Sequence, residues 1–175
     1  MAQTLAEETT AEDRFTVAVW RRLRDTGAPL SEEDIADLGA KSGLDAASVA
    51  QRLAAAGERD ADGRLAGLVG LSVADHPHRL MFEEHALSTW CAWDPFFLVP
   101  SLGGNARLET ADPVSGEVFT VQFVEGRAVP AADGREPVLS MVDRGALRTA
   151  DAASAADGDE QPATSDAVEE LWSSF

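Results

Sequence analysis

The chain has 175 residues, of which 45% are hydrophobic, and this size and composition are typical of one globular domain or two small ones. Its 31 acidic residues outnumber its 14 basic ones, which gives a net charge of -17. This charge argues against binding to nucleic acid or to an anionic membrane surface, because both are themselves negatively charged.

The sequence also indicates a cellular compartment. The N-terminal segment is acidic and rich in threonine, unlike a secretory signal, and no apolar run approaches the roughly 20 residues of a membrane-spanning helix. Cys91 is the only cysteine, which excludes an internal disulfide and suits a reducing environment. We therefore expect a cytoplasmic protein without a transmembrane segment.

The N-terminal part carries the hydrophobic spacing of short helices. Residues 1–10 are predicted to form a flexible tail, and residues 12–24 place apolar side chains on one helical face. Gly27 follows as a helix stop. A second helix is predicted to begin at the Ser31–Asp34 capping box and to continue through two apolar residues, Ile35 and Leu38.

A third helix and a hairpin complete this part, which spans residues 11–80. Asp45 is placed to cap the helix, and Gly57 is placed to end it. Asp62 and Gly63 form a hairpin turn signal before an apolar stretch. Three helices followed by a hairpin are typical of a winged-helix domain. Because acids outnumber basic groups here, a structural scaffold is favoured over a DNA-binding role.

The second part, residues 81–142, is predicted to combine a broken helix with antiparallel strands. Residues 86–102 look helical, but Pro95 and Pro100 interrupt them. Asp94 is therefore expected to end one turn and to cap the next, with Pro95 at the first helical position. Three further segments read as strands: residues 107–110, 118–123 and 138–142.

The remaining residues differ in composition. Residues 143–166 are rich in Ala, Asp, Ser and Gly, and we expect a flexible acidic segment there. Residues 167–175 return to apolar spacing and predict a short C-terminal helix. The predicted fold is thus α+β: a winged-helix-like N-terminal part with a hairpin, then a small antiparallel-strand region with a proline-broken helix.

A thiol and a carboxylate lie three residues apart in the segment Trp90–Asp94. On a helix this spacing would place Cys91 and Asp94 on one face. Thiolates bind soft metals such as Zn, Cu(I) and Hg(II), and a carboxylate beside a thiol can accept its proton and later return it. Free cysteine is also often a small buried apolar side chain, so spacing alone leaves a purely structural role open.

The histidines offer an alternative metal site. His76 and His78 flank Pro77, and His85 lies nearby. This spacing matches no recognised zinc pattern, and Cys91 is too isolated to complete one. Surface or core roles are therefore favoured over metal binding for the histidines.

The chain resembles the organomercurial (alkylmercury) lyases. The resemblance runs through Pro77–Leu80 and is most specific at Trp90–Asp94, because the family has Trp-Cys-Ala, one variable residue and Asp. The Leu102-Gly103 pair and the Pro113–Gly116 turn are also similar to the family. The resemblance therefore covers most of the chain.

The resemblance implies a role for each member of the thiol–acid pair. Cys91 would bind the mercury of R–Hg⁺, and Asp94 would handle the proton. The carbon leaving group is too basic to depart free, so a positioned acid must protonate it. The products would be a hydrocarbon and Hg(II), handed on to a low-molecular-weight thiol or a mercuric reductase. No organic cofactor is implied, since mercury is substrate and product.

The family also has a second, later cysteine, which this sequence lacks. The segment Glu170–Phe175 is similar to the one that leads to it. Three explanations stay open: a longer protein, a thiol recruited from solution or from another chain, or a relative that binds mercury without lysis. The alternatives to a lyase are a non-catalytic soft-metal or effector-binding protein and a winged-helix regulator. The acidic charge of the chain argues against the regulator. No particular oligomeric state is indicated.

Overall fold

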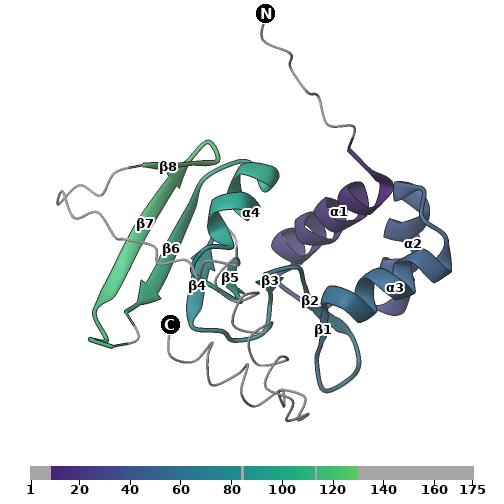
Figure 1. Cartoon of the computed structure of the whole chain (residues 1–175), viewed down its shortest axis with the longest axis horizontal. Coiled ribbons are helices and arrows are strands. Elements are labelled where there is room, and N and C mark those ends of the chain that lie inside the picture. Colours follow the sequence, from purple (N-terminus) through teal and green to yellow (C-terminus); the bar gives the residue numbers. More distant parts are fainter. Residues whose placement is uncertain (1–8, 84, 113, 130–175) are drawn as a thin grey trace, which may run out of the picture. The chain divides into compact units, whose positions relative to one another are not determined.

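The computed structural model describes residues 9–83, 85–112 and 114–129 (Figure 1). The chain divides into two compact units, and the first comprises Met1–Ala111 and Val118–Glu136. All the helices and strands of the described residues belong to this first unit. Within those residues, no helix is long and apolar enough to cross a membrane.

The second unit comprises Asp112–Glu117 and Pro137–Phe175. In its described part, Asp112 Oδ1 accepts hydrogen bonds from the backbone N–H groups of Val114 and Ser115, which closes a turn. Several predicted features lie outside the described residues. They are most of the tail at 1–10, the strand at 138–142, the acidic segment at 143–166 and the helix at 167–175.

Helix α1 (Ala11–Thr26) begins at a capping box. The Thr10 side chain accepts a hydrogen bond from the Asp13 N–H, and an Asp13 carboxylate oxygen accepts one from the Thr10 N–H. At the other end Gly27 adopts a left-handed conformation (φ 60°), and its N–H donates to a carbonyl of the last turn. The helix predicted over 12–24 and its glycine stop are therefore confirmed.

The next two helices also begin where their capping residues predict. Helix α2 (Glu32–Ser42) follows Ser31, which forms a reciprocal capping box with Asp34. Helix α3 (Ala46–Ala56) follows Asp45, whose carboxylate accepts a hydrogen bond from a backbone N–H of the first turn at 2.8 Å. Both predicted starts are confirmed.

One antiparallel sheet follows the three helices. Its strands are β1 (Gly57–Arg59), β2 (Leu65–Leu68), β3 (Leu71–Ser72), β4 (His78–Met81), β5 (Ala86–Thr89), β6 (Ala106–Ala111), β7 (Val118–Val124) and β8 (Arg127–Val129). Their order in the sheet is β1-β2-β3-β5-β4-β6-β7-β8, and every neighbouring pair is antiparallel. The structure confirms a mixed α+β fold, and the predicted strands at 107–110 and 118–123 correspond to β6 and β7.

The helix expected over residues 86–102 is wrong in its first half. Strand β5 occupies the start of this segment, and only α4 (Pro95–Leu102) is helical. The reason is non-local: β5 lies between β3 and β4, where its backbone groups are paired on both sides and Leu87 is buried. Pro95 does stand in the first helical turn, as predicted. The predicted interruption at Pro100 is wrong, because Pro100 lies inside α4, which continues to Leu102.

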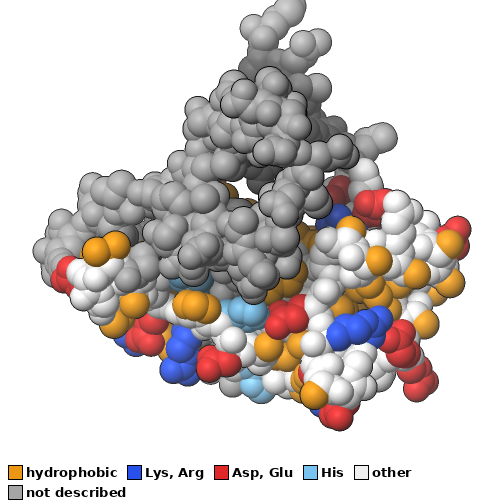
Figure 2. Space-filling model, turned by 60° about the horizontal axis from the view of Figure 1, so that its bottom comes forward, with side chains coloured by type: hydrophobic (Ala, Val, Ile, Leu, Met, Phe, Trp, Pro, Cys, Tyr) orange, Lys and Arg blue, Asp and Glu red, His pale blue; other side chains and the backbone are white. Residues whose placement is uncertain are grey.

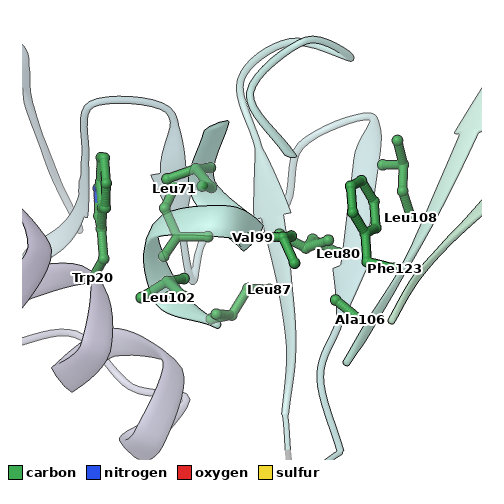
Figure 3. Packing of buried hydrophobic residues seen from close by; sticks show 10 residues of the cluster. Trp20, Leu71, Leu80, Leu87, Val99, Leu102, Ala106, Leu108 and Phe123 are labelled. Carbon is green, nitrogen blue, oxygen red and sulfur yellow. The ribbon is translucent and has the colours of Figure 1, made fainter. Parts of the chain in front are cut away.

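Buried hydrophobic side chains form two clusters in this unit. One joins the three N-terminal helices to β2 and includes Phe15, Val19, Leu23, Ile35, Val49, Leu53, Leu65 and Leu68. The other joins α4 to the sheet and includes Trp20, Leu80, Leu87, Leu98, Val99, Leu108 and Phe123. Figure 3 shows side chains of α4 and of the strands facing one another in this second cluster, with the Trp20 indole of α1 at one end. Helix α1 thus contributes to both clusters.

The Trp20 indole holds a buried hydrogen bond, from Nε1 to the Leu68 carbonyl oxygen at 2.7 Å. We expect Trp20→Phe to lower the free energy of unfolding by about 1–3 kcal/mol, because a buried acceptor loses its donor. Trp93→Phe is the matched control, since Trp93 is exposed and its loss should cost less than about 0.5 kcal/mol. Urea unfolding followed by far-UV circular dichroism measures both. Equal stability of the two variants would contradict the expectation.

Candidate functional site

The segment Trp90–Asp94 forms the turn that connects β5 to α4. Two hydrogen bonds hold the backbone at the start of the turn. The Trp90 N–H donates to the Gly70 carbonyl oxygen at 3.1 Å, and the Thr89 hydroxyl donates to the Cys91 carbonyl oxygen at 3.0 Å. Thr89 is fully buried in the sheet. The turn that carries the thiol is therefore attached to the sheet by hydrogen bonds at two points.

Asp94 is a buried acid, with 8% of its surface exposed. It occupies the N-cap position of α4, but its side chain makes no capping hydrogen bond. Its Oδ2 instead accepts a hydrogen bond from the Cys91 N–H at 2.8 Å. The expectation that the Asp94 side chain caps the helix is therefore wrong: its backbone is itself helical, which turns the carboxylate back toward Cys91.

Gly70 makes room for this carboxylate. It lies with Val69 in the tight turn between β2 and β3, and both residues have positive φ angles, 45° for Val69 and 87° for Gly70. A Cβ atom on Gly70 would lie 2.7 Å from Asp94 Cγ and 2.9 Å from each carboxylate oxygen. The carboxylate thus packs directly against the Gly70 backbone, a place that no other residue type would leave open.

Cys91 is half-buried and carries a free thiol. Burial raises the pKa of this thiol, and a hydrogen bond to Asp94 and the charge of that carboxylate raise it further. Backbone N–H groups of Trp93 and Asp94 act in the opposite direction, with smaller effect. The thiol therefore keeps its proton at neutral pH and lies against the group that can take it.

The three histidines have separate partners. His76 Nε2 lies 3.1 Å from both carboxylate oxygens of Glu58, whereas His78 Nδ1 lies 2.7 Å from Thr110 Oγ1. His85 lies against Gly27. Among the described residues, no three His, Cys, Asp or Glu side chains are grouped so that they could hold a metal ion.

His78 does lie within electrostatic reach of Asp94. Burial lowers the pKa of His78, and the negative charge of Asp94 only partly offsets this effect. His78 is therefore neutral at neutral pH and leaves Asp94 without a cationic partner on that side.

Aromatic side chains surround the turn. Trp90 and Trp93 are 38% and 44% exposed, and Trp93 stacks on Phe96 with ring centroids 5.8 Å apart. Phe96 in turn contacts Phe123 edge-on. On the face of the molecule drawn in Figure 2, hydrophobic, acidic and histidine side chains lie side by side. The turn thus presents apolar surface close to its thiol and acid.

The structure brings the two predicted site residues together and adds neighbours that the sequence did not single out. Gly70 contacts the turn from the β2–β3 connection, Glu58 contacts it from β1, and Thr89 contacts it from the end of β5. A Val-Gly pair inside an apolar stretch was the only available sign of the β2–β3 turn. For Glu58 the sequence carries no signal, because its contact with Trp90 joins residues 32 positions apart and depends on strand pairing.

Two comparisons with known proteins give a match. Residues 71–156 match the family model described as alkylmercury lyase (MerB). A similar solved structure is the crystal structure of the mercury-bound form of MerB2, with 16% sequence identity and a TM-score of 0.52; the match covers 72% of this chain and 68% of that chain. At this identity the structural likeness shows a shared fold. No curated protein sequence matches.

Proposed function

We propose that this chain cleaves mercury–carbon bonds by protonolysis, because residues 71–156 match the alkylmercury lyase family model. The proposed substrate is an organomercurial small molecule, R–Hg⁺, and the products are a hydrocarbon and Hg(II). Cys91 is the mercury ligand in this proposal, and Asp94 is the proton acceptor and donor. No organic cofactor takes part.

One observation carries the proposal: inside the family segment, the Cys91 thiol lies against the buried Asp94 carboxylate. The thiol is the soft ligand that mercury requires. Its raised pKa keeps the proton in the site until a metal arrives, and metal binding then releases it. The nearest base is Asp94, so the released proton stays beside the reacting atoms.

The reaction follows in two steps. The Cys91 sulfur bonds to mercury and displaces a weaker ligand, while the thiol proton passes to the Asp94 carboxylate. Asp94 then gives this proton to the carbon bonded to mercury. The electron pair of the breaking Hg–C bond forms the new C–H bond, so the hydrocarbon leaves and Hg(II) stays on sulfur. Asp94 ends as a carboxylate, ready for another cycle.

A second thiolate would push electron density onto mercury and weaken the Hg–C bond. The 175 residues contain one cysteine, so in this proposal a low-molecular-weight thiol supplies the second sulfur. The same thiol, or a mercuric reductase, then accepts Hg(II) from Cys91. A second candidate function rests on this single cysteine: a non-catalytic protein of the same fold that binds a soft metal.

We further infer that the N-terminal helices act as a winged-helix-like scaffold and that the protein works in the cytoplasm. The scaffold role is supported by α1, α2 and α3, which pack with β2 in one hydrophobic cluster, and by the hairpin in which β1 pairs with β2. The reducing compartment is supported by the free thiol of Cys91. DNA binding is not part of this proposal.

Cys91→Ser tests the function directly. The variant should release no methane from methylmercury, or benzene from phenylmercury, in excess thiol, because the hydroxyl is a hard and far weaker ligand for mercury. Gas chromatography measures the hydrocarbon, and Ser88→Ala, a buried change in the same strand region, serves as the control. Stoichiometric Hg(II) binding by the unmodified protein without any hydrocarbon would reject the lyase and favour the binding protein.

A further inference from the structure

A second acid, Glu58 of β1, lies outside the thiol–acid pair and yet contacts its turn. In the sheet Glu58 pairs with Gly67 of β2. A Cβ atom on Gly67 would lie 2.9 Å from Glu58 Oε2 and 2.9 Å from Ser72 Cβ. The absence of a side chain at Gly67 therefore lets the Glu58 carboxylate lie across β2 toward β3.

Two side chains donate hydrogen bonds to this carboxylate. Trp90 Nε1 donates to Oε2 at 2.9 Å, and His76 Nε2 lies 3.1 Å from both oxygens, a geometry that fits one N–H shared between them. The Ser72 hydroxyl, which donates to the Ala66 carbonyl oxygen at 3.3 Å, lies close enough to Glu58 to help lower the pKa of its carboxyl group. Burial alone would raise the pKa of Glu58, but these hydrogen bonds outweigh burial and lower it. Glu58 is thus a charged, multiply bonded acceptor.

Trp90 is the residue directly before Cys91, and packing alone does not immobilise it, because 38% of its surface is exposed. Two polar contacts hold it instead. Its backbone N–H donates to Gly70, and its indole N–H donates to Glu58, a residue 32 positions earlier in the chain. Both acceptors belong to the β1–β3 part of the sheet, so together they fix the backbone from which the thiol projects.

We propose that Glu58 is a positioning residue that holds the Cys91 thiol in its half-buried place by anchoring the Trp90 indole. The hydrogen bond to a charged acceptor is stronger than one to a neutral group, and it spans the start of the turn. Without it the indole and the Cys91 backbone move outward together, and the thiol loses both its burial and its contact with Asp94.

The inference deepens the proposed function, but its test needs no mercury chemistry. Because Cys91 is the only cysteine, the rate of alkylation by iodoacetamide at pH 8 reports on this thiol alone. Glu58→Ala should raise the rate by about three- to tenfold, since an exposed thiol ionises more readily. Glu58→Gln keeps an acceptor for the indole and should stay within about twofold of the unmodified protein.

Glu32→Ala is the matched control, because it removes a nearby carboxylate that pairs with Arg59 and does not contact the turn. The alkylation rate of each variant is measured between 0 and 1 M urea. If the rate does not change with urea concentration, global unfolding is excluded as the cause of a faster reaction. A double variant gives the decisive comparison. In a protein that already carries Trp90→Phe, Glu58→Ala should not change the alkylation rate further, because the indole hydrogen bond that connects Glu58 to the turn is already absent.

Two results would overturn the inference: an unchanged alkylation rate in Glu58→Ala, or the same increase with and without the Trp90 indole. Nuclear magnetic resonance gives an independent readout. The Trp90 indole N–H signal should move upfield in Glu58→Ala and stay close to its original position in Glu58→Gln. Failure of the lyase assay alone would reject the proposed function and leave these outcomes intact.

Discussion

Asp94→Asn is expected to slow hydrocarbon release by about 10²- to 10⁴-fold, the usual contribution of a positioned general acid, and to make Cys91 more reactive. Both effects have one cause. The amide still accepts the Cys91 N–H, so the turn is kept, but it neither takes up nor returns a proton. Because the amide is neutral, the variant also lacks the negative charge and the thiol hydrogen bond that raise the pKa of Cys91.

The pH dependence of alkylation measures the second effect. The unmodified thiol has a pKa above the ordinary 9.0, so its alkylation rate keeps rising beyond that pH. In Asp94→Asn the curve should shift to lower pH, and the rate at pH 8 should rise about tenfold for each pKa unit lost. Asp75→Asn, on an exposed residue, is the control. Unchanged hydrocarbon release would rule out Asp94 as the acid.

Gly70→Ala is expected to lower the free energy of unfolding by about 1–3 kcal/mol and to disrupt the site. The left-handed backbone (φ 87°) costs an alanine about 1–2 kcal/mol, and the collision with Asp94 Cγ at 2.7 Å adds to this. Because the carboxylate must move, hydrocarbon release should fall by about 10²-fold, the cost of a displacement of about 1 Å.

Gly63→Ala separates these two costs. Gly63 also has a left-handed backbone (φ 79°), but a Cβ atom there would meet nothing within 4 Å. This control should therefore lose only the backbone contribution to stability, and its Cys91 alkylation rate and hydrocarbon release should stay unchanged. Urea unfolding and the alkylation assay measure both variants. Equal effects in the two would mean that Gly70 does not support the acid.

The N-terminal helices were predictable because their ends are decided by neighbouring residues. Thr10, Ser31 and Asp45 each bond to a backbone N–H three positions later. Gly27 supplies the left-handed stop of the first helix. The assignment of these helices to a winged-helix domain stays a prediction.

Strand β5 was mistaken for part of a helix because its conformation depends on distant partners. Its neighbours in the sheet are β3 and β4, and neither pairing can be read from the β5 residues themselves. The β2–β3 turn was missed for a different reason. It places Val69 at φ 45°, a conformation that β-branched residues rarely adopt.

The sequence by itself determined the three capped helices, the proline at the start of α4 and a thiol and an acid three residues apart, because these features involve only nearby residues. It also carried the resemblance to the alkylmercury lyases that residues 71–156 bear out. Tertiary structure alone decided that Asp94 is buried against Gly70 and that Glu58 binds Trp90. Those contacts join segments far apart in the chain, and the pairing of the strands within the sheet brings these segments together.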